Sequence, residues 1–89
     1  MRFLHSEVDA SAGDVIEVTL DRQANVRVLD STNFSRYQSG RPFQQYGGLA
    51  VKSPVLIPVP HSGRWHVVVD LMGYTGSVGA SVSVRRKAS

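Results

Sequence analysis

Cysteine is absent from this chain of 89 residues. No disulfide can therefore brace the fold, and no thiolate can serve as a nucleophile or a metal ligand. Long apolar runs are absent too, because no segment approaches the roughly 18 consecutive apolar residues that a membrane-spanning helix needs. Residues 1–7 also lack the apolar stretch of a signal peptide. We therefore expect a cytoplasmic protein that does not bind a membrane.

A strong excess of charge of one sign is missing as well. Ten basic residues against seven acidic residues give a formal net charge of +3. Arg85, Arg86 and Lys87 account for the whole excess, so we predict a frayed basic tail over residues 85–89 rather than a basic binding face. Residues 1–89 are long enough for one domain only, and so small a core cannot enclose a drug-sized cavity. A binding site is therefore expected to be a surface groove.

Helical periodicity is scarce, whereas apolar and polar residues alternate repeatedly, as in half-buried strands. The predicted strands are 2–6, 14–20, 25–29, 55–59, 64–71 and 77–85. The tight connection 21–24 is expected to join strands 14–20 and 25–29 as a hairpin, and residues 73–76 form a second turn. Because Pro58 cannot donate a main-chain hydrogen bond, its strand is expected to lie at a sheet edge or to carry a bulge. This pattern predicts an all-β fold, a small antiparallel β-sandwich or flattened barrel of about six strands.

The longest stretch without a strand pattern is 31–53, and connections longer than about 15 residues are usually functional or disordered. Asp30 or Ser31 is suited to cap a helix of one or two turns that Gly40 ends. The stretch holds four of the seven aromatic residues, namely Phe34, Tyr37, Phe43 and Tyr46. We therefore expect it to fold onto the sandwich, with rings that close the open end of the core.

Several segments resemble one family of short bacterial domains. The most specific are Tyr46-Gly47-Gly48 and Pro60-His61-Ser62-Gly63-Arg64-Trp65, and the others are 1–5, 13–18 and 25–30. Together they closely resemble domain of unknown function 1883. The resemblance implies a compact β-sandwich and a bacterial source, sometimes in chains that also carry a Toll/interleukin-1-receptor-like domain. No catalytic residue and no ligand come with it.

Catalytic and metal chemistry find little support in the spacing of residues. A hydrolase would recruit Ser62, His66 and Asp70, but four strand residues separate His66 from Asp70 by roughly 13 Å, too far for a base and its orienting acid. His5, His61 and His66 lack the spacing of a metal site, and each is expected to be a surface or turn residue. We therefore expect no metal, no cofactor and no catalytic residue. An enzyme of unknown reaction at a surface site around His61 and His66 is the alternative.

A non-catalytic binding or protein-interaction module is the function that we predict, with a protein or a small ligand as the partner. Arginine and tyrosine offer a large contact area together with a polar group, which makes them frequent at interfaces. The candidate binding residues are Arg36, Tyr37, Arg41, Tyr46, His61 and Arg64.

The sequence is compatible with two other kinds of partner. Basic residues interleaved with aromatic rings in the long loop are typical of single-stranded nucleic-acid binding, but the outward strand positions are polar rather than aromatic, and this function is placed third. Val15, Leu56 and Val68 point outward in the predicted strands, where a solvated face seldom carries such residues. A homo-oligomer, or packing against a fused neighbour, would cover them.

Overall fold

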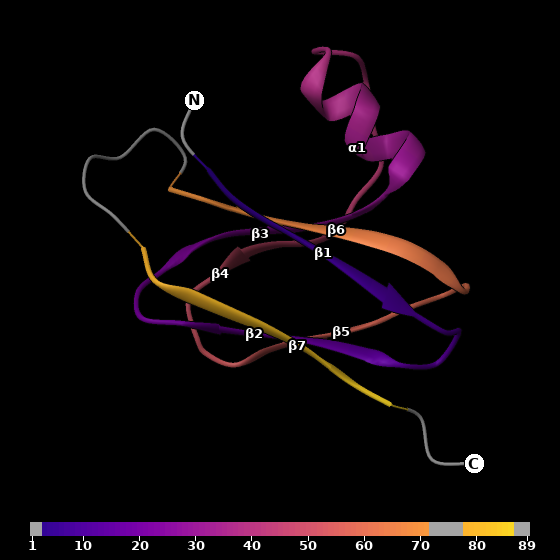
Figure 1. Cartoon of the computed structure of the whole chain (residues 1–89). Helices are drawn as coiled ribbons and strands as arrows, with labels where there is room; N and C mark the ends of the chain where they lie inside the picture. The colour runs from indigo at the N-terminus through magenta and orange to yellow at the C-terminus, as the bar shows by residue number, and fades with distance from the viewer. Residues whose placement is uncertain (1–2, 72–77, 87–89) are drawn as a thin grey trace.

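Two antiparallel sheets pack face to face in the computed structural model, which describes residues 3–71 and 78–86 (Figure 1). The elements are β1 (Phe3–Ala10), β2 (Val15–Leu20), β3 (Ala24–Asp30), α1 (Ser31–Gln38), β4 (Tyr46–Ala50), β5 (Val55–Pro58), β6 (Gly63–Asp70) and β7 (Ala80–Arg85). One sheet has the order β1-β6-β3-β4 and the other the order β5-β2-β7. The predicted all-β sandwich is confirmed, and the sheets do not close into a barrel.

The core lies between the sheets, where the alternating apolar residues of both layers meet. The buried residues of this cluster are Ala10, Ile16, Val18, Ala24, Val26, Val28, Ile57, Val59, Trp65, Val67 and Val69. Trp65 is the largest side chain that is completely buried. Its indole nitrogen donates a hydrogen bond to the carbonyl of His61 at 3.2 Å, which satisfies the polar group of an otherwise apolar ring.

The predicted hairpin of strands 14–20 and 25–29 is wrong. β2 pairs with β5 and β7, whereas β3 pairs with β4 and β6, so the connection between them crosses from one sheet to the other. Asp21, the first residue after β2, contacts the segment before β7, because its carboxylate accepts the N–H of Gly79 at 2.8 Å. The alternation of residues indicates which face of a strand is buried. It does not indicate whether the next strand pairs with it in the same sheet or packs against it from the opposite sheet.

Helix α1 covers the outer face of the four-stranded sheet (Figure 1). Leu29, Phe34 and Val68 form a second buried apolar cluster there, and Tyr37 and Phe43 pack against it. The long loop therefore folds onto the sandwich as predicted, but these rings cover an outer face instead of closing the end of the core. Val68 lies on the outer face, as predicted, but it is completely buried under α1 of its own chain, so neither a second copy nor a fused neighbour is needed to cover it.

The predicted cap of α1 is confirmed at Asp30, whose carboxylate accepts the main-chain N–H of Asn33 at 2.8 Å. Replacing Asp30 by alanine is expected to lower the free energy of unfolding by about 1 kcal/mol, because that N–H loses its acceptor. Urea denaturation measures the change. Thr32→Ala, in the same exposed first turn, is the matched control and should cost less than about 0.5 kcal/mol. Equal losses in the two variants would show that Asp30 does not cap the helix.

Strand β4 is absent from the sequence prediction because two of its five residues are glycines, which disfavour strands. Gly47 has a φ of 101°, and a Cβ atom built there would lie 2.5 Å from the carbonyl oxygen of Val26. Only glycine allows β4 to approach β3 this closely. The Tyr-Gly-Gly motif thus builds an edge strand rather than a loop.

The structure differs from the sequence prediction at both ends of the chain. β1 continues to Ala10, beyond the predicted end at residue 6. Arg85 pairs with Glu17, and Arg86 donates to the buried Asp14 carboxylate at 3.0 Å, so both charges are balanced.

The predicted turn at 73–76 and the remainder of the predicted tail, 87–89, lie outside the described residues. Within the described residues, no helix has the length and apolar character to span a bilayer.

Candidate functional site

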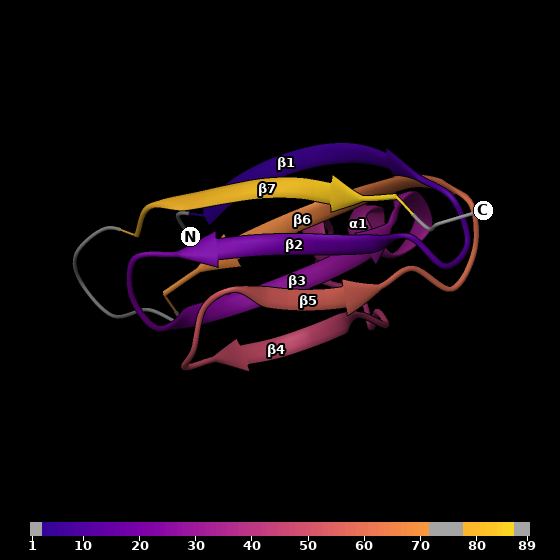
Figure 2. The same cartoon turned by 90° about the horizontal axis from the view of Figure 1, so that it is seen from below.

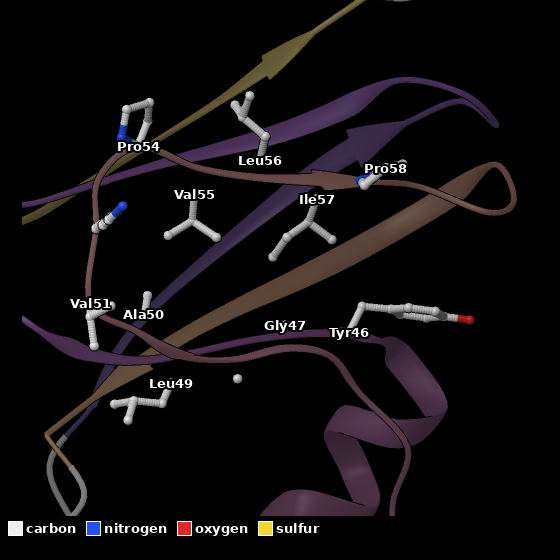
Figure 3. Close-up of a pocket in the computed structure, with 12 residues that line it drawn as sticks. Tyr46, Gly47, Leu49, Ala50, Val51, Pro54, Val55, Leu56, Ile57 and Pro58 are labelled. Atoms are coloured by element: carbon white, nitrogen blue, oxygen red, sulfur yellow. The ribbon is translucent and has the colours of Figure 1, made fainter.

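β4 and β5 are edge strands of the two sheets and lie side by side (Figure 2). An open groove runs between them along one side of the sandwich (Figure 3). We call it the β4–β5 groove; it is lined by residues 46–52 and 54–58 and has a volume of about 820 Å³. Among the described strands, β4 pairs only with β3 and β5 only with β2. Each strand therefore presents one unpaired main-chain edge on this side of the molecule.

Apolar side chains are concentrated in this groove. Of the five large apolar side chains that are exposed in the described chain, four line it, namely Tyr46, Leu49, Val51 and Leu56. The fifth, Leu4, lies on β1, at the opposite edge of the four-stranded sheet. Figure 3 shows Val55 and Ile57 pointing from β5 toward β4, whereas Leu49 and Leu56 point away from the space between the two strands. The groove therefore exposes the margin of the core.

Charge is almost absent from the same surface. Lys52 is the only charged residue that lines the groove, and within the described residues its ammonium group makes no ion pair. A single unpaired cation beside apolar side chains favours a ligand with one carboxylate next to an apolar segment.

The six binding residues predicted from the sequence do not converge on one surface. Tyr46 and His61 come together at one end of the sandwich, because both rings contact Trp65, with centroid distances of 5.9 and 4.8 Å. Tyr37 instead lies on α1, edge-on to Phe43 at 5.2 Å. Of the six, only Tyr46 lines the groove.

The three predicted arginines lie in two places. Arg36 and Arg41 are exposed in α1 and just beyond it, and Arg41 donates to the hydroxyl of Ser39 at 3.1 Å. Arg64 is on β6 and pairs with Glu7 at 3.1 Å and Asp9 at 3.3 Å. These residues therefore share no cavity.

A second group of polar side chains lies on the outer face of the four-stranded sheet, beside the N-terminus of α1. In the register of β1 and β6, Glu7 lies opposite His66 and His5 lies opposite Val68. His5, Glu7 and His66 therefore project from the same face, and we call them the outer-face cluster. Nδ1 of His66 lies 3.0 Å from Nε2 of His5 and 3.5 Å from Oε1 of Glu7.

Each side chain of this cluster is held by a neighbour. The Oγ atom of Ser31 lies 3.1 Å from Nε2 of His66, and Arg64 donates to the second oxygen of Glu7 at 3.1 Å. Phe34 stacks on both imidazole rings, with centroid distances of 4.3 Å to each. Burial lowers the pKa of His66, although the Glu7 carboxylate opposes this shift. The ring is therefore neutral at pH 7.

A family model described as a domain of unknown function (DUF1883) matches residues 1–88 of the chain. The chain belongs to the DUF1883 family. This confirms the resemblance in the Tyr-Gly-Gly and Pro-His-Ser-Gly-Arg-Trp segments. No curated protein and no solved structure matches the chain. The functional argument for this DUF1883 domain therefore rests on its own residues.

The hydrolase arrangement considered from the sequence does not form in the DUF1883 chain. Asp70 accepts hydrogen bonds from Arg27 at 3.1 Å and Asn25 at 3.4 Å. Ser62 accepts the N–H of Ala12 at 3.1 Å. His66 instead contacts His5 and Ser31. The three residues of the proposed hydrolase thus have separate partners.

A different serine faces His66, and the row Ser31, His66, Glu7 has the chemical order of a hydroxyl, a base and an acid. In a serine hydrolase the acid must hold the Nδ1 proton of the histidine. Here Nδ1 lies closer to His5, at 3.0 Å, than to Glu7, at 3.5 Å. The geometry therefore brings three electron-pair donors together and is better suited to hold a cation than to activate Ser31.

Sequence reasoning missed both the groove and the outer-face cluster. The prediction that His66 is a surface or turn residue is wrong, because the residue is only 6% exposed. The alternation His5-x-Glu7 was a signal for a shared face, but His66 is 59 positions beyond Glu7 and joins them only through the register of β1 and β6. The groove could not be predicted without β4, and the two glycines of β4 disfavour the prediction of a strand there.

Proposed function

We propose that this DUF1883 domain is a binding module that holds an extended segment of a partner protein in the β4–β5 groove. One observation carries the proposal: of the five residues in the described chain with exposed large apolar side chains, four border this groove. Exposed apolar side chains that gather in one place, rather than being scattered singly, mark interaction sites. A bacterial source and a cytoplasmic location remain predictions from the sequence.

The shape of the groove favours a polypeptide over a small molecule. Small-molecule sites bury most of the ligand surface in a concave pocket, whereas this groove is open along its length (Figure 3). An extended segment can add its main chain to an exposed sheet edge while alternate side chains enter apolar contacts. The unpaired edges of β4 and β5 supply such positions, and Lys52 favours an acidic residue in the segment.

Of the six binding residues predicted from the sequence, this proposal uses only Tyr46. His61 lies 3.9 Å from Asp30 and His66 faces His5 and Ser31, which does not favour an enzyme built on the two histidines together. Val51 and Leu56, which a second copy of the chain could also cover, are part of the groove. Self-association is therefore an outcome that the experiment has to distinguish.

The test is selection of peptides from an unbiased displayed library of extended 12-residue segments, followed by fluorescence anisotropy with the selected peptides. We expect alternating apolar sequences with an acidic residue. Leu49→Asp should weaken their binding at least 10-fold, because a carboxylate then occupies the apolar surface. Leu4→Asp changes another exposed leucine, on β1, and is the matched control; it should leave the affinity unchanged.

Two additional arms separate the alternatives. Lys52→Glu should reverse the preference for acidic over basic peptides, and N-methylation of alternate peptide residues should abolish binding if the peptide pairs with a sheet edge. Failure to enrich apolar peptides, or equal losses in Leu49→Asp and Leu4→Asp, would refute the proposal. Sedimentation that shows a dimer dissociated by Leu49→Asp would identify a second copy as the occupant instead and would equally refute it.

A further inference from the structure

We propose that His5, Glu7 and His66 form a binding site for a divalent transition-metal ion with the ligand preferences of Zn²⁺. The proposal is independent of the β4–β5 groove. The cluster lies on the outer face of the four-stranded sheet, on β1 and β6, whereas β4 forms the opposite edge of that sheet. The two proposals can therefore fail separately.

The donor atoms are spaced as ligands of one ion. The cluster offers two imidazole nitrogens and one carboxylate oxygen, all within 4.8 Å of one another. Around zinc, ligands at about 2.0–2.2 Å in tetrahedral geometry lie about 3.3 Å apart. The separations from Nδ1 of His66, 3.0 Å to His5 and 3.5 Å to Glu7, bracket this value. The third pair, His5 and Glu7, lies within 4.8 Å, so these two side chains have to move closer together to admit the ion.

Neighbouring groups orient the donors toward a common point. A metal-binding histidine usually donates its second ring N–H to a polar partner, which fixes its tautomer. Ser31 lies 3.1 Å from Nε2 of His66 and can accept that N–H, so Nδ1 presents its lone pair. Arg64 binds the far oxygen of Glu7 at 3.1 Å, so Oε1 is directed at His66.

Phe34 fixes the planes of the rings as well as their tautomers. It stacks on His66 with an interplanar angle of 5° and on His5 with an angle of 23°. In the metal-free protein, one of the two facing nitrogens donates its proton to the other. When the ion binds, both offer lone pairs, and His5 carries its proton on the other ring nitrogen.

The ligand set selects the class of ion. Two imidazoles and one carboxylate suit zinc and the neighbouring first-row ions, whereas Mg²⁺ and Ca²⁺ prefer oxygen ligands alone. Three protein ligands leave at least one coordination position for water or for another molecule. The positive charge of Arg64 does not prevent cation binding, because it is balanced by Glu7 and Asp9.

The test is isothermal titration calorimetry of the untagged full chain with Zn²⁺ alone, in a buffer that does not chelate metals. We expect one ion per chain. His5→Ala should weaken binding at least 100-fold, and since His5 is exposed the variant should fold normally. Ser31→Ala, which removes only the orienting partner, should weaken it about 10-fold. His61→Ala, an exposed histidine outside the cluster, is the matched control and should bind as the wild type does.

A second readout does not depend on the heat of binding. Co²⁺ in place of Zn²⁺ should give visible absorption bands of a low-coordinate nitrogen and oxygen site, and these should be absent in His5→Ala. Absence of one-to-one binding in the wild type would overturn the proposal. So would equal affinity in His5→Ala, equal losses in His5→Ala and His61→Ala, or binding of Mg²⁺ as tight as that of Zn²⁺.

Discussion

Replacing Trp65 by alanine is expected to lower the free energy of unfolding by about 3–5 kcal/mol. Trp65 is the largest completely buried side chain and belongs to the core between the sheets. Its removal leaves a cavity and deprives the carbonyl of His61 of the indole donor at 3.2 Å. Guanidinium denaturation followed by circular dichroism measures the loss, since tryptophan fluorescence is absent in the variant.

Trp65→Phe is the control that separates volume from mere substitution, and it should cost clearly less than the alanine variant. Trp65→Ala should also weaken peptide binding indirectly, because Tyr46 of the groove packs edge-on against Trp65 at 5.9 Å. A loss below about 1 kcal/mol in Trp65→Ala, the level of an average substitution, would contradict the packing described for the core.

The second large effect is expected at Asp70, the acidic centre of a buried polar network under α1. Asp70 is 2% exposed and accepts from Arg27 at 3.1 Å and from Asn25 at 3.4 Å. Asp70→Ala should lower the free energy of unfolding by about 3 kcal/mol, because it leaves the half-buried guanidinium group of Arg27 without its carboxylate partner. Thermal and urea denaturation measure this loss.

Asp9→Ala is the matched control, since Asp9 also pairs with an arginine but is exposed. Its loss should stay below about 1 kcal/mol, as for surface ion pairs in general. The double variant Arg27→Met with Asp70→Leu should be more stable than Asp70→Ala, because no charge is then buried alone. Similar losses in Asp70→Ala and Asp9→Ala would show that the network contributes no more than a surface pair.

Alternation along the chain was sufficient to predict the fold class, and the alternate residues Ile16, Val18, Trp65, Val67 and Val69 are buried in the core. It was insufficient for pairing, because β2 and β3 bury the same core from opposite layers. Local chemistry predicted the Asp30 cap correctly. Contacts between distant segments, which decide that α1 covers Val68, have no local signature.

The two candidate sites depend on such distant contacts even more strongly. Tyr46 was predicted as a binding residue and lines the groove. The other apolar residues of the groove were not predicted, because β4 and β5 become neighbours only in the folded sandwich. His5, Glu7 and His66 carry no metal-binding spacing within the sequence. Their convergence results from the β1–β6 register and from the aromatic ring that α1 places over them.

The most direct test of the binding module is to follow backbone amide chemical shifts while a selected peptide is added to the full chain. The groove predicts changes concentrated at residues 46–58, with β1 and β7 almost unaffected. Changes centred on Arg36 and Arg41 in and beside α1, or spread evenly over the sandwich, would contradict the assignment of the binding site to the β4–β5 groove.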